Sequence, residues 1–149
     1  MIKTNIFISG HRNITRDEFN THYTKLIDQY IEWAKNKSHL GDKRLTFYVG
    51  DCEGCDKMAV FYLLDKLCDN IKLVVCSLKE EFDGQTNYDY LEENDSLNRI
   101  TTIKEFNSHE ERDCYMTEQT EFDILWVREG EWTSGTAQNF VRRNFHKTI

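Results

Sequence analysis

FYVGDCEGCDK, at residues 47–57, joins a short run of aromatic and β-branched residues to a predicted helix through a glycine-containing turn. The run predicts a buried strand, and Gly50 and Gly54 allow backbone conformations and close approaches that a side chain would block. The helix that we predict to begin near Gly54 presents backbone N–H groups without an intrahelical partner. These groups and the positive end of the helix dipole attract a phosphate or a carboxylate. The stretch therefore predicts a strand–turn–helix joint with a ligand site beside it.

The same turn is acidic. Asp51, Glu53 and Asp56 place three carboxylates in it, which argues against a site that holds a triphosphate with backbone amides alone. The acidic turn fits better into a site where carboxylates bind sugar hydroxyls, while the amides and a cation from another loop hold a phosphate. We therefore predict that Gly50, Asp51, Gly54 and Asp56 bind the sugar of a ligand.

The composition is that of a single globular domain spanning residues 1–149. Hydrophobic residues make up 39% of the chain and charged residues 30%, which allows a sizeable core and a well-solvated surface. The net charge of −7 argues against a nucleic-acid partner, because a phosphate backbone is bound by clustered Lys and Arg. No stretch reaches the roughly 18 apolar residues of a membrane span, so we expect no membrane partner and a cytoplasmic location.

The five cysteines are an odd number without the spacing of a disulfide framework, which predicts reduced thiols. Cys52 and Cys55 form a CxxC pair, but a zinc site would need a second pair of matching spacing. Neighbouring carboxylates oppose the low thiol pKa of a redox-active pair. We therefore predict neither a metal nor a cofactor. Of the three tryptophans, Trp33 and Trp126 are expected in the core, whereas Trp132 could stack on a base.

Hydrophobic runs and helix start signals alternate along the chain, which predicts a βαβαβ order at its beginning. Capping boxes at residues 15–18 and 108–111 open two helices, and residues 134–136 open the last one. Residues 77–98 show little periodicity beyond a turn suggested at residues 83–87. The predicted strands are residues 5–10, 45–49, 71–76, 100–106 and 122–127, the last of them buried on both faces.

Short buried strands separated by helices predict a parallel sheet with right-handed crossovers. The predicted fold class is α/β, a three-layer Rossmann-like open sheet of about five mostly parallel strands with helices on both faces. Such sheets bind ligands outside the carboxyl ends of their strands, where the winding direction reverses. Three loops are predicted at that edge, at residues 9–12, 50–56 and 128–136.

The first and third of these loops supply what the acidic second loop lacks. Ser9-Gly10-His11-Arg12 follows the first strand and brings the positive charge of Arg12. Ser134-Gly135-Thr136 offers two hydroxyls and several amides to a phosphate at a helix start. Each loop taken alone also has a purely structural interpretation, because a glycine turn that opens a helix is common in folds of this class.

Four motifs occur in order along the chain: Ile8-Ser9-Gly10-His11-Arg12, Val49-Gly50-Asp51-x-x-Gly54-x-Asp56-x-x-Ala59, Arg112-Asp113-x-x-Met116-x-x-x-x-x-x-Asp123 and Ser134-Gly135-Thr136-Ala137-x-Asn139. They resemble the Rossmann-like superfamily often called SLOG, which includes lonely-guy phosphoribohydrolases, the DNA-processing protein DprA, molybdenum-cofactor carrier proteins and sensor domains. The resemblance leaves out only residues 77–107. It implies that Arg112 and Asp113 face the phosphate loop and orient sugar or phosphate, and that the protein forms a homodimer.

The region around Arg112-Asp113 and Ser134-Gly135-Thr136 is similar also to nucleoside 2-deoxyribosyltransferases and deoxynucleotide N-hydrolases, which cleave a base from a sugar. Those enzymes generally place a catalytic glutamate shortly after the Gly-Thr pair, where this chain has Ala137-Gln138-Asn139. Gln138 cannot act as a nucleophile or a general base, which counts against cleavage. Carboxylates that could substitute for it are Asp51, Asp56, Asp113 and Glu131.

The resulting expectation is a protein that binds a nucleotide or a nucleotide-derived small molecule, as a sensor or a carrier does. Two alternatives stay open. An N-glycosidic hydrolase or deoxyribosyltransferase would need a carboxylate near the C1′ position of its substrate. A protein-interaction module would have a crevice too shallow for a nucleotide.

Overall fold

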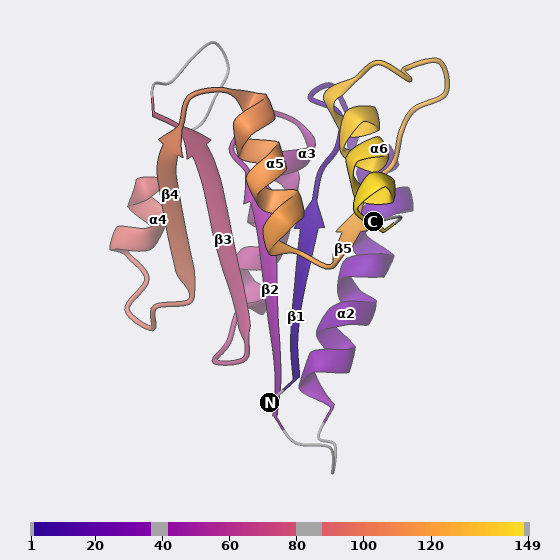
Figure 1. Ribbon diagram of the computed structural model, residues 1–149. Helices are drawn as coiled ribbons and strands as arrows, with labels where there is room; N and C mark the ends of the chain where they lie inside the picture. The colour runs from indigo at the N-terminus through magenta and orange to yellow at the C-terminus, as the bar shows by residue number, and fades with distance from the viewer. Residues whose placement is uncertain (1, 37–41, 80–87, 148–149) are drawn as a thin grey trace.

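One parallel sheet of five strands forms the centre of the molecule in a computed structural model that describes residues 2–36, 42–79 and 88–147. The strand order is β4-β3-β2-β1-β5, and every neighbouring pair is parallel (Figure 1). The predicted α/β Rossmann-like fold class is confirmed. The strands are β1 (Ile2–Ile8), β2 (Lys43–Gly50), β3 (Ile71–Leu78), β4 (Ile100–Phe106) and β5 (Phe122–Ile124).

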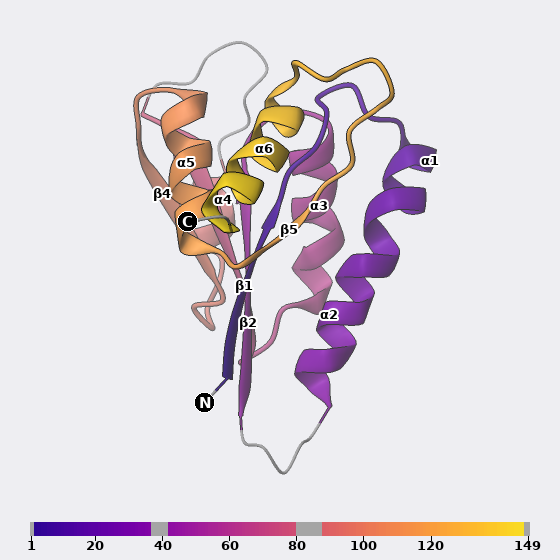
Figure 2. The same cartoon turned by 45° about the vertical axis from the view of Figure 1, so that its right-hand side comes forward.

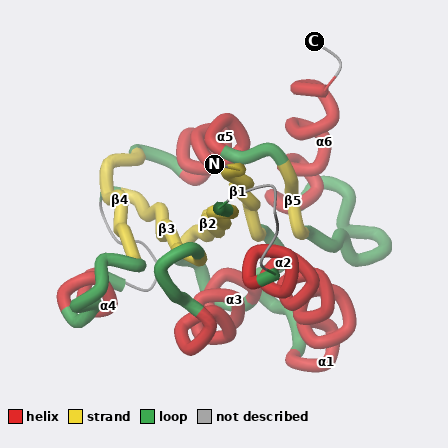
Figure 3. The backbone as a smooth tube through the Cα atoms, turned by 90° about the horizontal axis from the view of Figure 1, so that it is seen from below, coloured by secondary structure: helices red, strands yellow, loops and turns green. Residues whose placement is uncertain are grey.

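Helices cover both faces of the sheet. Figure 3 shows α5 and α6 on one face and α2 and α3 on the other. The helix before β2 is continuous through a π-helical segment, and α3 ends in a short 3-10 turn. The helical elements are α1 (Arg16–Phe19), η1 (Asn20–Thr24), α2 (Lys25–Lys35), α3 (Cys55–Leu63), η2 (Leu64–Lys66), α4 (Asp89–Glu93), α5 (His109–Gln119) and α6 (Gly135–Lys147).

The two faces of the sheet bury separate apolar clusters, because successive side chains of a strand point to opposite faces. Ile6 and Ile8 of β1 belong to the large cluster, which also includes buried residues of α2 and α3. Phe7 lies between them in sequence and belongs to the smaller cluster, with Met116 of α5. This alternation fixes the register of β1 and thereby the direction in which the following loop leaves the sheet.

The winding direction reverses between β1 and β5. The chain adds β2, β3 and β4 on one side of β1 and then crosses the sheet through α5 to place β5 on the other side. In Figures 1 and 2, α3, α5 and α6 all begin at the edge where the strands end. This edge next to β1 is the expected ligand position of a doubly wound sheet.

The predicted fifth strand is too long and too buried. Strand β5 covers only Phe122–Ile124 at the sheet edge, and Phe122 is 46% exposed. The ladder ends because the Trp126 N–H donates to the Tyr23 hydroxyl oxygen at 3.0 Å instead of to a strand. Edge strands are commonly short, since an edge leaves backbone groups open to further pairing.

The helix starts predicted at residues 15–18 and 108–111 are confirmed, with one difference in the hydrogen bonds of the second. Thr15 and Glu18 form the complete predicted capping box at α1. At α5 the Ser108 hydroxyl accepts the Glu111 N–H, but the Glu111 carboxylate accepts the Asn107 N–H at 2.9 Å and not that of Ser108. The turn suggested at residues 83–87 lies outside the described residues.

Candidate functional site

The three predicted loops meet around one cavity of about 330 Å³ at the carboxyl ends of β1 and β2. Helices α5 and α6 supply the rest of its wall. Most of the predicted site residues line it: Ser9, Gly10, His11, Arg12, Gly50, Asp56, Arg112, Asp113, Ser134, Gly135 and Thr136. Two predicted residues, Asp51 and Gly54, do not.

Gly54 acts through the backbone of the first loop instead of through the cavity. Its φ is +79°, and a Cβ atom there would lie 2.1 Å from the carbonyl oxygen of Arg12. Such a distance is impossible for a real side chain, so only glycine lets the β2–α3 turn touch the loop after β1. The Cys55 N–H donates to the His11 carbonyl oxygen at 3.1 Å and holds the same two segments together.

Arg112 is the centre of a buried ion-pair cluster. Its guanidinium lies 3.0 Å from Asp113 Oδ1 and 3.4 Å from Asp51 Oδ1, and all three side chains are largely buried. Nη1 also donates to Cys52 Sγ at 3.4 Å. Burial opposes the positive charge, but the adjacent Asp113 and Asp56 carboxylates raise the pKa of Arg112 above its usual value. The predicted role of Asp51 in binding sugar is not supported, because its carboxylate pairs with Arg112 behind the cavity wall.

Asp56 lies in the cavity wall, and none of the described residues forms an ion pair with it. The Cys52 N–H donates to its Oδ2 at 3.1 Å. A Cβ atom on Gly50 would lie 2.7 Å from the same oxygen, so this carboxyl position requires glycine at residue 50. Burial raises the pKa of Asp56 to about 7, while Arg112 opposes the shift and Asp113 adds to it. A carboxyl group of this kind exchanges a proton near neutral pH.

The residue that faces the cavity after the Gly-Thr pair is Asn139, not Gln138. Asn139 is 3% exposed, and its Nδ2 donates to Asp113 Oδ2 at 3.1 Å. The exposed Gln138 side chain turns back and donates to the Thr133 carbonyl oxygen at 3.2 Å. Gln138 therefore points away from the cavity, because a helix points neighbouring residues in different directions.

The start of α6 offers unused hydrogen-bond donors to the cavity. The Ser134 hydroxyl oxygen accepts the Ala137 N–H at 3.1 Å and caps the helix. The N–H groups of Gly135 and Thr136 donate to none of the residues that the structure describes. A Cβ atom on Gly135 would meet nothing within 4 Å, so the space before the helix is open. This arrangement suits an anion.

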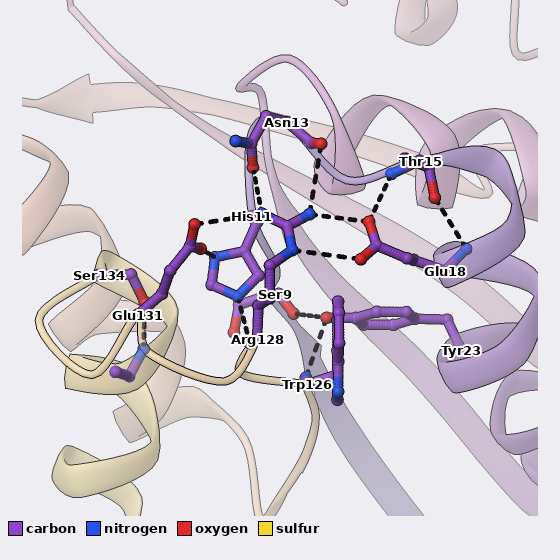
Figure 4. Close-up of polar contacts among 11 residues, drawn as sticks. Ser9, His11, Asn13, Thr15, Glu18, Tyr23, Trp126, Arg128, Glu131 and Ser134 are labelled. Carbon is purple, nitrogen blue, oxygen red and sulfur yellow. Dashed lines mark hydrogen bonds and ion pairs between the residues drawn. The ribbon is translucent and has the colours of Figure 1, made fainter.

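Arg128, in the third predicted loop, is held by the protein itself (Figure 4). It donates to both carboxylate oxygens of Glu18, at 2.7 and 3.2 Å, and to Asn13 Oδ1 at 3.0 Å. The hydrogen bonds from Arg128 lower the pKa of Glu18 to about 2. Glu131 Oε1 accepts a further bond from Arg128 at 3.2 Å. Arg128 therefore joins the loop before α6 to the segment that contains Asn13 and Glu18. Glu131 does not line the cavity.

His11 belongs to the same loop-to-loop network. Its Nε2 accepts the backbone N–H of Arg128 at 2.8 Å, and its Nδ1 lies 3.1 Å from Glu131 Oε2. This pairing fits a neutral ring that carries its proton on Nδ1. Burial lowers the pKa of His11, and Glu131 opposes that shift. The ring lines the cavity, but both of its nitrogen atoms already contact protein groups, the Arg128 backbone N–H and the Glu131 carboxylate.

Several lining residues were not among the predicted ones: Phe7, Cys52, His109, Met116 and Asn139. Arg12 Nη2 lies 3.0 Å from His109 Nε2, and His109 Nδ1 lies 3.9 Å from Cys52 Sγ. The available signal for His109 was its place at the start of a helix that follows a parallel strand. Trp132 is 68% exposed and lies outside the cavity.

Comparisons with known protein families, characterised proteins and solved structures find no match to this chain. All five cysteines are free, and burial raises the pKa of Cys52. Within residues 2–36, 42–79 and 88–147 there is no group of three His, Cys, Asp or Glu side chains placed to hold a metal ion. The helices described in these ranges are too short or too polar to cross a membrane.

The contact at Gly54 predicts a large stability cost for any side chain there. We expect Gly54→Ala to lower the free energy of unfolding by about 3 kcal/mol or more, since backbone strain adds to the clash with Arg12. Gly130→Ala is the matched control, because Gly130 also has a positive φ, of +85°, but has nothing within 4 Å. It should cost about 1 kcal/mol from strain alone. Urea unfolding measures both, and equal costs would contradict the proposed contact.

The His11 network predicts a loss of stability in acid. Because folding lowers the pKa of His11 from 6.5, the unfolded chain binds a proton more readily than the folded one. The stability that neutral His11 contributes is therefore complete above pH 6.5 and is lost as the pH falls through the lower folded pKa. Urea unfolding between pH 7 and 5 should show this slope, and His11→Gln should reduce it. His22→Gln is the control, and an unchanged slope in His11→Gln would refute the assignment.

Proposed function

We propose that the protein binds a nucleotide or a nucleotide-derived small molecule in the cavity beside β1, as a sensor or carrier. The observation that carries the proposal is the convergence of an anion site and a carboxyl group in one cavity. Arg12 and the start of α6 would hold a phosphate, and Asp56 and Asp113 would face the sugar or base. The volume of about 330 Å³ lies at the lower end of the range for small-molecule sites, roughly 300–1,000 Å³.

The contacts of Arg12 and Arg128 support the assignment of Arg12 to the phosphate. Arg128 is bound by Glu18, Asn13 and Glu131, so its charge is used within the protein. Arg12 is exposed and contacts His109, whose pKa is lowered by burial, by Arg112 and by Arg12. A neutral His109 leaves the charge of Arg12 available to an anion in the cavity.

N-glycosidic hydrolysis or deoxyribosyl transfer is the second candidate. It is favoured by two carboxyl groups, Asp56 and Asp113, in the wall of the cavity. Asp113 already accepts hydrogen bonds from Arg112 and Asn139, so Asp56 is the better candidate for proton transfer. An interaction module without a ligand is less well supported, because the cavity is open.

We further propose a cytoplasmic location and a homodimer. Free thiols throughout the chain support the first. The homodimer is supported by the resemblance and by exposed apolar side chains, which are Trp132 in the loop before α6 and Phe140 and Val141 on α6. A second copy would cover them, and light scattering of the purified protein would show a dimer that Val141→Glu dissociates. A wild-type monomer at micromolar concentration would contradict this.

A thermal-shift screen tests the binding proposal. Its ligands are AMP, dAMP, NAD, ADP-ribose and cyclic ADP-ribose, and each sample is then analysed for released base. A ligand at about a hundred times its dissociation constant adds ~2.7 kcal/mol of stability. Stabilisation without released base supports a sensor or carrier, and released base supports the hydrolase. No shift with any ligand would favour the interaction module.

Arg12→Ala should weaken the binding of the ligand found in that screen by roughly 10- to 100-fold, because a charge-assisted hydrogen bond contributes about 1.5–3 kcal/mol. Arg16→Ala is the matched control, since Arg16 lies four positions later and does not line the cavity. Isothermal titration calorimetry measures both affinities. Equal affinities of the Arg12 variant and the wild type would exclude Arg12 from the anion site.

A further inference from the structure

The ion-pair cluster around Arg112, at one end of the cavity, contains more negative than positive charge. Asp51, Asp56 and Asp113 surround the single guanidinium of Arg112. A Cβ atom on Gly50 would lie 2.7 Å from Asp56 Oδ2 and 3.0 Å from Arg112 Cζ, so both groups border the same small space. If all three carboxylates were ionised, these four side chains together would carry two more negative than positive charges. An anionic ligand would add to this excess.

Of the three carboxyl groups, Asp56 is the one that Arg112 does not pair with. The guanidinium is within 3.4 Å of Asp51 and 3.0 Å of Asp113. Asp56 receives one hydrogen bond, from the Cys52 N–H to Oδ2. Within the described residues nothing donates to its other oxygen, Oδ1, although the residue is only 7% exposed and lines the cavity. A buried carboxylate with a single partner is costly unless it is protonated.

A second buried group in the same cavity is also unsatisfied. Ser9 Oγ has no hydrogen-bond partner in the described part of the chain, and the residue is 6% exposed. Buried hydroxyls nearly always have a partner. Ser9 lines the cavity, as Asp56 does. The residues that line the cavity thus include two polar side chains whose hydrogen-bonding capacity is not fully used by the described residues.

The titratable groups around Asp56 come from every element that packs against it. Burial is the largest influence on Asp56 and raises its pKa to about 7. Only one of these groups is a cation. They are Asp51 and Cys52 in the β2–α3 turn, Cys55 of α3, Tyr23 of η1, and Arg112 and Asp113 of α5.

We propose that the cavity takes up its anionic ligand together with one proton, that this proton resides on Asp56, and that Asp56 donates it as a hydrogen bond from Oδ1. This inference rests on the proposed function and restricts the ligands to those that carry a second polar group. Besides its phosphate, the ligand presents a hydrogen-bond acceptor to Asp56, such as a sugar oxygen, a base carbonyl or a ring nitrogen. The proton comes from solvent, and no covalent bond changes.

Calorimetric titration with AMP tests the proton uptake. It is performed between about pH 8 and pH 9, where a phosphate monoester with its second pKa of about 6 stays doubly ionised. Two buffers of different ionisation enthalpy give the number of protons bound. We expect about one proton per AMP and an affinity that falls roughly tenfold per pH unit. An affinity independent of pH, without proton uptake, would overturn the proposal.

Two variants sharpen this test. Asp56→Asn resembles the protonated side chain, with an oxygen for the Cys52 N–H and an NH₂ group for the ligand, so it should bind AMP independently of pH. Glu53→Gln removes a charge from the same turn, outside the cavity, and should leave the pH dependence unchanged. Loss of binding in a folded Asp56→Asn protein would show instead that the ionised carboxylate is needed.

A measurement on the free protein separates this proposal from the proposed function. Carbon-13 NMR of the aspartate carboxyl groups, with Asp56→Asn used for assignment, follows Asp56 without any ligand. A midpoint near neutral pH supports the proposal, and a carboxylate that stays ionised down to about pH 5 overturns it. Failure of AMP to bind would count against the proposed function for that ligand, and the carbon titration would still decide the state of Asp56.

Discussion

The site depends on the ion pairs that the buried guanidinium of Arg112 forms with Asp51 and Asp113. The guanidinium joins Asp51 in the turn after β2 to Asp113 on α5, two segments that approach each other only because the sheet brings them to one edge. Removing one partner of such a cluster leaves an uncompensated buried charge, which typically costs about 3–5 kcal/mol. The position of the β2–α3 turn, and with it that of Asp56, is therefore set by a residue about 60 positions away in sequence, at 112. The glycine at residue 50 completes this arrangement, because any larger residue would displace both Asp56 and Arg112.

Most of the fold follows from local patterns in the sequence, because strand runs and helix caps depend on neighbouring residues. Residues 47–57 predicted the end of β2 and the start of α3, and the Thr15 capping box predicted α1. The length of β5 could not be predicted in this way. It is decided by a hydrogen bond between Trp126 and Tyr23, which are far apart in the sequence.

The candidate site was predictable in position but not in the direction of individual side chains. Parallel strands bring their carboxyl ends to one edge, so the loops at residues 9–12, 50–56 and 134–136 had to meet. Whether a polar residue in such a loop faces the cavity depends on its partners. Asp51 turns to Arg112, and Gln138 turns to Thr133, although both stand in motifs that suggested a role in the site. Sequence spacing alone contains no information on these long-range pairs.

The overall charge of the protein and the local charge of its site act on different scales. A net charge of −7 repels an anion at a distance, but salt screens that repulsion beyond a Debye length of about 8 Å. Within the cavity the nearest groups decide, and they differ from one end to the other. The start of α6 and Arg12 favour negative charge, whereas Asp56 and Asp113 disfavour it. Under the proposed function, we expect a ligand with its charge at one end to bind in a single orientation, with the phosphate toward α6 and the less charged part toward Asp56. We expect this polarity to favour an elongated monoester over a compact, evenly charged anion of similar volume.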